Sequence, residues 1–155
     1  MRTLTAVLTA AAVLALPAAA SAYIQVDQGI AGARVGNTQA QVKAALGDPA
    51  HVQTGSNDFG DYTNFVYEGG LRVFFQGKKR VTSVVALGRG DRTTRGVGVG
   101  SSEKTVKQKV KGVKCETTAG TRSCHTGEFT PGSRVTDFRI EKGRVTSVTI
   151  GDVLD

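Results

Sequence analysis

The pentapeptide Arg-Val-Thr-Ser-Val occupies residues 80–84 and occurs again at residues 144–148, 64 positions further along the chain. Residues 35–85 can be aligned on residues 99–149 without a gap, and 13 of the 51 aligned positions are identical. An ungapped match of this length is typical of an internally duplicated chain. We therefore predict that one supersecondary unit occurs twice.

Each aligned segment begins with the signals of a short helix. Thr38 and Gln41 form a capping box, in which the two side chains bond to backbone N–H groups of the first turn, and Ser102 caps the second helix. About four strand-like stretches follow each helix. The sequence thus predicts an α+β fold of two tandem units, residues 23–90 and 91–155, each a helix followed by an antiparallel meander. We expect the two units to pack together as one layered structure.

Residues 1–22 have the pattern of a secretory signal peptide. Arg2 gives a short basic start, an apolar run extends from Leu4 to Leu16, and Ala22 ends a small-residue cleavage motif. The apolar run is shorter than the ~20 residues of a spanning helix, so we expect a protein that does not span the membrane. The pattern predicts cleavage after Ala22 and a product that is secreted, periplasmic or held in the cell envelope.

The formal net charge of +7 suits acidic protein surfaces or anionic polymers, and predicted export argues against nucleic acid as the partner. His51 and His125 lack cysteines or carboxylates at metal-ligand spacing. The sequence also contains no serine-hydrolase, Walker A or zinc-protease motif. We therefore expect a monomer that is not an enzyme and that uses neither a metal nor a cofactor.

The two cysteines, Cys115 and Cys124, flank a short hairpin centred on Ala119 and Gly120. A two-residue turn there places the cysteines directly opposite each other, close enough for a disulfide. A primed turn requires positive φ at Ala119, which alanine adopts poorly, so a bulged turn that shifts the register by one residue is the alternative. Export favours a disulfide over a reactive thiol pair.

Strand alternation separates two faces of the predicted sheet. The face assigned to the core carries Phe65, Tyr67, Phe74, Thr82, Val84 and Ala86 in the first unit, and Phe129, Phe138, Thr146, Val148 and Ile150 in the second. The other face of the first unit is also apolar, through Val66, Leu71, Val73, Phe75 and Val85. A large exposed apolar patch marks an interaction site. This second face is either a partner surface or a surface that the rest of the protein covers.

The predicted second helix, residues 102–111, has two different sides. Lys104, Lys107 and Lys111 lie on one side, and valines lie on the other. Such a basic stripe is either a solvated face or a docking face for an anionic polymer or lipid surface.

The stretch Gly36-x-Thr38-x-x-Gln41-Val42, with Gly47 and Pro49 after it, resembles the signature helix of the β-lactamase inhibitory protein family. It is also similar to the outer-membrane assembly lipoproteins of the SmpA/OmlA (BamE) type. The resemblance implies an eight-stranded layer built from two repeats. It also implies a concave sheet face that grips protein partners, without catalysis.

Two hypotheses of function follow. The first is a secreted, non-catalytic module that binds a protein, with inhibition of an enzyme as one form of that activity. The second is a cell-envelope component that holds an anionic polymer or lipid through the basic helix face. Binding of a polymer through lysines is weakened strongly by salt, whereas binding through an apolar sheet face is not.

Overall fold

The computed structural model describes residues 23–77 and 79–154. The predicted signal peptide and its cleavage site lie outside these residues. A three-stranded sheet comes first, and eight further strands form a larger antiparallel sheet in the order β4-β5-β6-β7-β11-β10-β9-β8. The small sheet consists of β1 (Ile24–Gln25), β2 (Gly29–Ile30) and β3 (Ala33–Arg34). The large sheet consists of β4 (His51–Asn57), β5 (Gly60–Val66), β6 (Leu71–Gln76), β7 (Ser83–Ala86), β8 (Lys114–Thr118), β9 (Thr121–Thr126), β10 (Arg134–Glu141) and β11 (Arg144–Asp152).

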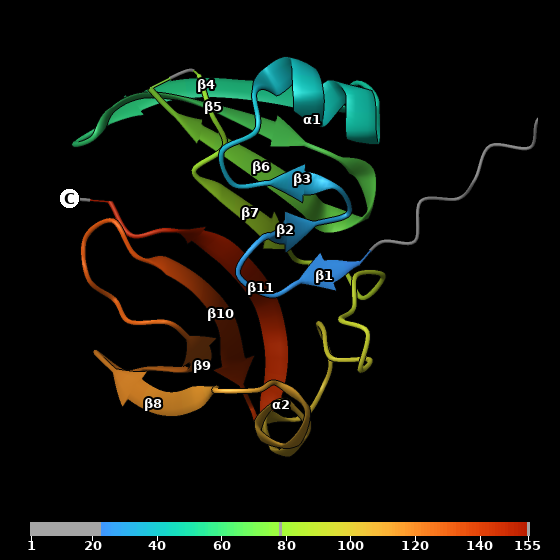
Figure 1. Ribbon diagram of the computed structural model, residues 1–155, viewed down its shortest axis with the longest axis vertical. Helices are drawn as coiled ribbons and strands as arrows, with labels where there is room; N and C mark the ends of the chain where they lie inside the picture. Colours follow the sequence, from blue (N-terminus) through green and yellow to red (C-terminus); the bar gives the residue numbers. More distant parts are fainter. Residues whose placement is uncertain (1–22, 78, 155) are drawn as a thin grey trace, which may run out of the picture.

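The helical segments are short. The α-helices in the described ranges are α1 (Gln39–Leu46) and α2 (Glu103–Lys109), and a 3-10 turn, η1 (Glu68–Gly70), precedes β6. Figure 1 shows β4 and β8 at opposite ends of the molecule, with α1 near β4, α2 near β8 and the small sheet between the helices.

The predicted α+β class, with two units of a helix and a meander, is wrong. The protein is mostly β, with an eight-stranded and a three-stranded sheet and helices of only 8 and 7 residues. The end strands of two separate meanders would each leave a row of unpaired backbone groups. Here β7 pairs with β11 instead, which makes the large sheet continuous. Residues 23–34, which precede the first predicted helix, supply the small sheet.

The two copies of the pentapeptide make the same local contacts. The Gly36 N–H donates to the Val81 carbonyl, and the Gly100 N–H donates to the Val145 carbonyl, both at 2.8 Å. The Arg80 guanidinium donates to the Gly36 carbonyl, as that of Arg144 does to the Gly100 carbonyl. The recurring residues therefore attach the chain before each helix to a later segment of the same half.

The core lies on the face of the large sheet that carries α1, α2 and the small sheet. Val42 of α1 and Val106 of α2 are fully buried against it, as is Ile30 of β2. The sheet residues of the core include Phe65, Val73, Phe75, Phe138, Val148 and Ile150. The predictions for Phe65, Phe138, Val148 and Ile150 as core residues are confirmed.

The prediction for β6 is wrong, because the register differs by one residue. A two-residue turn at Gly69-Gly70 would have paired Phe65 with Phe74, but η1 shifts the pairing to Phe65 with Val73. A one-residue shift moves every side chain of a strand to the other face. Leu71, Val73 and Phe75 are therefore buried core residues and not a free patch, whereas Phe74 is half-buried on the opposite face.

The second unit also departs from the prediction at one aromatic residue. Phe129, which we had assigned to the core, lies outside the strands and is 54% exposed. The reason is that β9 ends at Thr126, and a loop connects it to β10.

Candidate functional site

The candidate site is the sheet face opposite α1, α2 and the small sheet, which we call the open face. Residues directly opposed on neighbouring strands lie on the same face. The pairing of the strands defines a continuous row across the whole sheet, one residue from each strand. In spatial order the row is His51, Val66, Arg72, Val85, Thr149, Asp137, His125 and Lys114.

The centre of the open face mixes apolar and charged side chains. Val66, Val85 and Phe74 are half-buried, and Arg72 is exposed between the two valines. Within the described ranges Arg72 has no ion-pair or hydrogen-bond partner. Val66 and Val85 are the members of the predicted apolar surface that do lie on this face.

A hollow of about 350 Å³ lies on the open face where β7, β11 and β10 run side by side. Ser83, Thr149 and Asp137 line it, and the exposed Phe129 lines it from the loop before β10. The hollow therefore combines a carboxylate, two hydroxyl groups and an aromatic ring.

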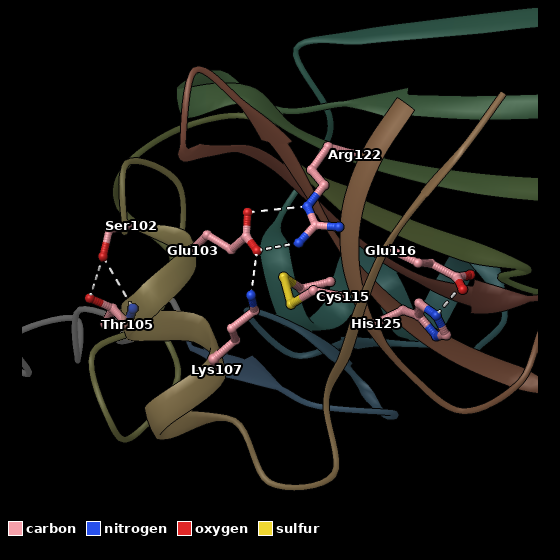
Figure 2. The surroundings of a disulfide bond; sticks show 9 residues. Ser102, Glu103, Thr105, Lys107, Cys115, Glu116, Arg122 and His125 are labelled. Atoms are coloured by element: carbon pink, nitrogen blue, oxygen red, sulfur yellow. Dashed lines mark hydrogen bonds and ion pairs between the residues drawn. A yellow bond between two sulfur atoms is a disulfide. The ribbon is translucent and has the colours of Figure 1, made fainter. Parts of the chain in front are cut away.

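His125 and Asp137 are direct partners across β9 and β10. The His125 side chain is 3% exposed, with Nδ1 3.1 Å from the Gly127 carbonyl oxygen and Nε2 3.3 Å from Oε1 of Glu116 (Figure 2). Burial raises the pKa of Asp137, and a hydrogen bond from Ser123 and the charges of neighbouring groups offset part of that rise. Burial is thus the largest influence on this carboxyl group.

Two buried oxygen atoms of the open face have no hydrogen-bond partner among the residues that the structure describes: Asn64 Oδ1 and Asp137 Oδ1. Asn64 and Asp137 offer oxygen acceptors. His125 Nε2 differs from them, because the Glu116 carboxylate lies within ion-pair distance of it. A buried acceptor without a donor is unfavourable by about 1–3 kcal/mol. Both oxygen atoms therefore favour a partner that supplies hydrogen-bond donors.

Ser123, His125 and Asp137 have the residue types of a hydrolytic triad but not its geometry. In a triad the histidine bridges the serine and the aspartate. Here Ser123 bonds to Asp137 directly, and the two ring nitrogens of His125 face Gly127 and Glu116. The cluster therefore lacks the order of hydrogen bonds that defines a hydrolytic triad.

The predicted disulfide between Cys115 and Cys124 is confirmed. The cysteines are direct partners in the hairpin of β8 and β9. Ala119 adopts φ of 48° and Gly120 adopts 78°, so the two-residue turn forms in place of the bulged alternative. The bond fits a protein from an oxidising compartment.

The three lysines of the predicted basic face are all exposed. Lys107 pairs with Glu103 at 2.7 Å, and Lys104 has no partner in the described part of the chain. The helix was predicted to reach Lys111 but ends at Lys109, because Val110 leaves the helical conformation and is buried. Lys111 therefore follows the helix and does not lie on it.

Sequence reasoning missed the combination of residues on the open face. It considered His125 only as a possible metal ligand, although its alternation with the core residue Cys124 could have placed it on the other face of a strand. Arg72 and Asp137 meet in one row only through long-range pairing.

No family model matches the chain, and no curated protein matches it. Among solved structures it is similar to an extracellular protein containing an SCP domain from Bacillus anthracis, with 11% identity and a TM-score of 0.51. That match covers 76% of this chain and 44% of the other, so the chain spans less than half of that protein. At this identity the likeness concerns the fold alone.

Two other solved structures are more distant in shape. A DUF4309 family protein from Bacillus subtilis is 16% identical, with a TM-score of 0.49, over 79% of this chain and 84% of the other. A cysteine-rich secretory protein from Staphylococcus aureus is 13% identical, with a TM-score of 0.48, over 76% of this chain and 44% of the other. None of the three is a β-lactamase inhibitory protein or a BamE-type lipoprotein.

Fold and site together define a mostly β, disulfide-bonded protein with a large antiparallel sheet. The helices and the small sheet cover one face of the large sheet, and the other face presents hydrogen-bond acceptors and apolar side chains. None of the helices in the described ranges is long and apolar enough to cross a membrane.

Proposed function

We propose that this protein is an exported, non-catalytic binding module that holds a protein partner on the open face of its large sheet. Export follows from the predicted signal peptide, with cleavage after Ala22, and the disulfide supports it. The observation that carries the proposal is the pair of unpartnered acceptors, Asn64 Oδ1 and Asp137 Oδ1, on one face.

The composition of the open face suits a protein. Phe74 and Val85 offer half-buried apolar area, and the hollow beside Phe129 can receive a side chain. An arginine or lysine of the partner would supply donors to Asp137, and an acidic residue would pair with the free Arg72. Aromatic and arginine residues carry much of the binding energy in protein interfaces.

Site-specific cross-linking tests the location of the interface. A photo-cross-linking amino acid is placed at position 85 or 149 on the open face, and at position 104 on α2 as the control. Exposure to the extract of the source envelope or culture medium should give a defined adduct from positions 85 and 149. An adduct that forms from position 104 alone would contradict the proposal.

Two substitutions then test which side chains of the open face contribute to the affinity for the captured partner. Arg72→Glu and Phe74→Ala should each weaken binding by roughly thirtyfold, as loss of an interface hot spot does. Lys104→Glu makes the same charge change on α2 and should leave the affinity unchanged. If neither open-face substitution changes the affinity, the interface does not lie on the open face.

A second function, binding of an anionic envelope polymer or lipid, is favoured by one observation near α2. A hollow of about 230 Å³ is lined by Arg95, Lys109 and Lys111, and by no carboxylate of the described residues. Replacing Arg95, Lys109 and Lys111 by glutamine tests this function with dextran sulfate as the probe, and replacing Lys104 and Lys107 by glutamine tests the rest of the basic face. Loss of dextran sulfate binding in the first variant, together with loss of that binding as the salt concentration rises to the physiological value, would support an anionic polymer as the partner in place of a protein.

A further inference from the structure

A cleft of about 680 Å³ lies on a different part of the molecule from the open-face row and from the lysines near α2. It opens between the end of α1, the turn around η1 and the loop after β7. The lining includes three acidic residues and three residues with apolar or aromatic side chains: Asp48, Glu68, Asp91, Leu46, Leu71 and Tyr67. Its volume is in the range of small-molecule sites, about 300–1,000 Å³.

The charges in this cleft are opposite in sign to the net charge of the chain. Asp48, Glu68 and Asp91 line it, in a protein whose formal net charge is +7. Asp48 already has an ion-pair partner in Lys43, at 2.9 Å. Glu68 has no ion-pair partner among the described residues, so Glu68 and Asp91 are the free carboxylates.

Arg89 is the cation among the described residues that line the cleft, but it also packs elsewhere. Its Nε lies 3.5 Å from the place that a Cβ on Gly100 would occupy, and Arg89 lines a separate hollow there with Lys142 and Arg144. Arg89 therefore extends toward Gly100, and no ion pair joins it to the carboxylates of the cleft within residues 23–77 and 79–154.

Asp91 is the residue whose environment indicates that the cleft binds a ligand. The residue is 6% exposed, and its Oδ1 has no hydrogen-bond partner in the described part of the chain. Burial raises the pKa of this carboxyl group. A buried carboxylate without a partner is unfavourable, and a cation that bonds to it removes that penalty.

We propose that the cleft binds a small organic cation, namely a protonated amine carried on an apolar body. The ammonium group bonds to Asp91, with Glu68 contributing negative charge at the surface. Leu46 and Leu71 contact the apolar body, and Tyr67 supplies an aromatic ring of the kind that attracts cations.

A divalent metal ion does not fit this cleft. In the part of the chain that the structure describes, Asp48, Glu68 and Asp91 do not bring three ligand atoms together, whereas a calcium ion takes about six to eight oxygens. The leucines and the tyrosine in the lining also suit an organic ligand better than a hydrated ion.

The test uses three probes of equal chain length: n-hexylamine, 1-hexanol and hexanoate. The purified protein is titrated at neutral pH in a buffer without amines, and the backbone amide signals are followed by NMR. Hexylamine should give saturable shifts at Ala31, Gly69 and Gly90, which line the cleft. It should bind at least about tenfold more tightly than hexanol, because an ionic hydrogen bond is added, and hexanoate should bind most weakly.

Substitutions identify the carboxyl group that binds the ammonium group of hexylamine. Asp91→Asn should weaken hexylamine binding by about tenfold without changing hexanol binding, and Glu68→Gln should weaken it less. Lys104→Gln, on α2, is the control and should change nothing. The amide spectrum of each variant reports whether it is folded, and the exposed Glu68 provides a second variant if Asp91→Asn disturbs the fold.

Three results would overturn this proposal: equal binding of hexylamine and hexanol, no saturable shift with hexylamine, or full hexylamine affinity in both acidic-residue variants. The proposal is independent of the open face, since it shares no residue with the row that crosses it. A protein partner on the open face can therefore be confirmed or refuted without affecting this result.

Discussion

Glu103 in the first turn of α2 forms a two-point ion pair with Arg122 of β9. The Glu103 Oε1 atom lies 2.5 Å from Nη2 of Arg122, and Oε2 lies 3.2 Å from Nε (Figure 2). Lys107 bonds to the same carboxylate one helical turn later. This cluster attaches α2 to the disulfide hairpin, because Arg122 stands two residues before Cys124.

The first prediction concerns this ion pair. The hydrogen bond from Arg122, and then that from Lys107, lower the pKa of Glu103 to about 2. A depressed pKa in the folded state contributes stability above the unfolded value, about 4.3, and that stability is lost as the pH falls toward 2. Glu103→Gln should therefore lower the free energy of unfolding by about 1 kcal/mol at pH 7 and much less near pH 2.

Urea unfolding at both pH values measures this difference. Glu141→Gln is the matched control, since Glu141 pairs with Arg139 on the exposed surface. It should change stability by at most a few tenths of a kcal/mol. Equal losses for Glu103→Gln at pH 7 and pH 2 would show that the ion pair is not the cause.

The second prediction concerns the disulfide. Replacing Cys115 and Cys124 by alanine should lower the free energy of unfolding by roughly 2–3 kcal/mol, because a cross-link restricts the unfolded chain. The measurement is denaturant unfolding of the variant and of the native protein. Peptide mapping without reduction provides the direct check, and recovery of both cysteines as free thiols would refute the bond.

The third prediction compares two neighbouring phenylalanines of β6. Phe75 is fully buried in the core, whereas Phe74 is half-buried on the open face. Phe75→Ala should cost about 3–5 kcal/mol of stability, as for other buried phenylalanines. Phe74→Ala should cost much less, and Phe138→Ala should resemble Phe75→Ala. A larger loss at Phe74 than at Phe75 in thermal or urea unfolding would mean that the faces of β6 are reversed.

The fourth prediction concerns the attachment of the small sheet. The Asp27 carboxylate accepts hydrogen bonds from the hydroxyl groups of Thr126 and Thr136, at 2.6 and 2.7 Å. Both threonines are buried, so Asp27→Ala leaves two hydroxyl donors without an acceptor and should cost about 2 kcal/mol. Amide hydrogen exchange should accelerate first in residues 23–34. Unchanged protection of that segment would mean that apolar packing alone holds it.

Local features of this fold could be predicted from the sequence. The capping box of Thr38 and Gln41 and the hairpin register of Cys115 and Cys124 each depend on residues fewer than ten positions apart, and both are confirmed. The pair Gly69-Gly70 is a sequence signal of a turn, but nothing in it indicates the extra residue that η1 adds to the connection. That one residue reversed the faces of β6 and so misplaced the apolar surface.

The long-range features could not be predicted in the same way. The row from Arg72 to Asp137 requires β7 to pair with β11, and neither strand carries a local signal of its partner. The acidic cleft joins Asp48, Glu68 and Asp91 from three separate connections between elements. Such sites depend on how distant parts of the chain pack together. Local sequence patterns carry no information about that packing.

The last prediction links stability and binding at Asp137. Burial raises the pKa of this carboxyl group, so folding favours its protonated form. The associated stability is fully present below the unfolded pKa of about 3.9 and is lost as the pH rises through the folded value. Asp137→Asn removes the charge and keeps an oxygen that can accept from Ser123. It should therefore be more stable than the native protein at neutral pH, with little difference near pH 3.

The same substitution should weaken binding of the partner that cross-links to the open face, because the charged acceptor is lost. Gain of stability with loss of affinity is the usual pattern when a binding site retains an unfavourable group for its function. Thermal unfolding at both pH values and a binding titration measure the two effects. A variant that is less stable at neutral pH would show that Asp137 is a structural residue, and unchanged affinity would remove it from the interface.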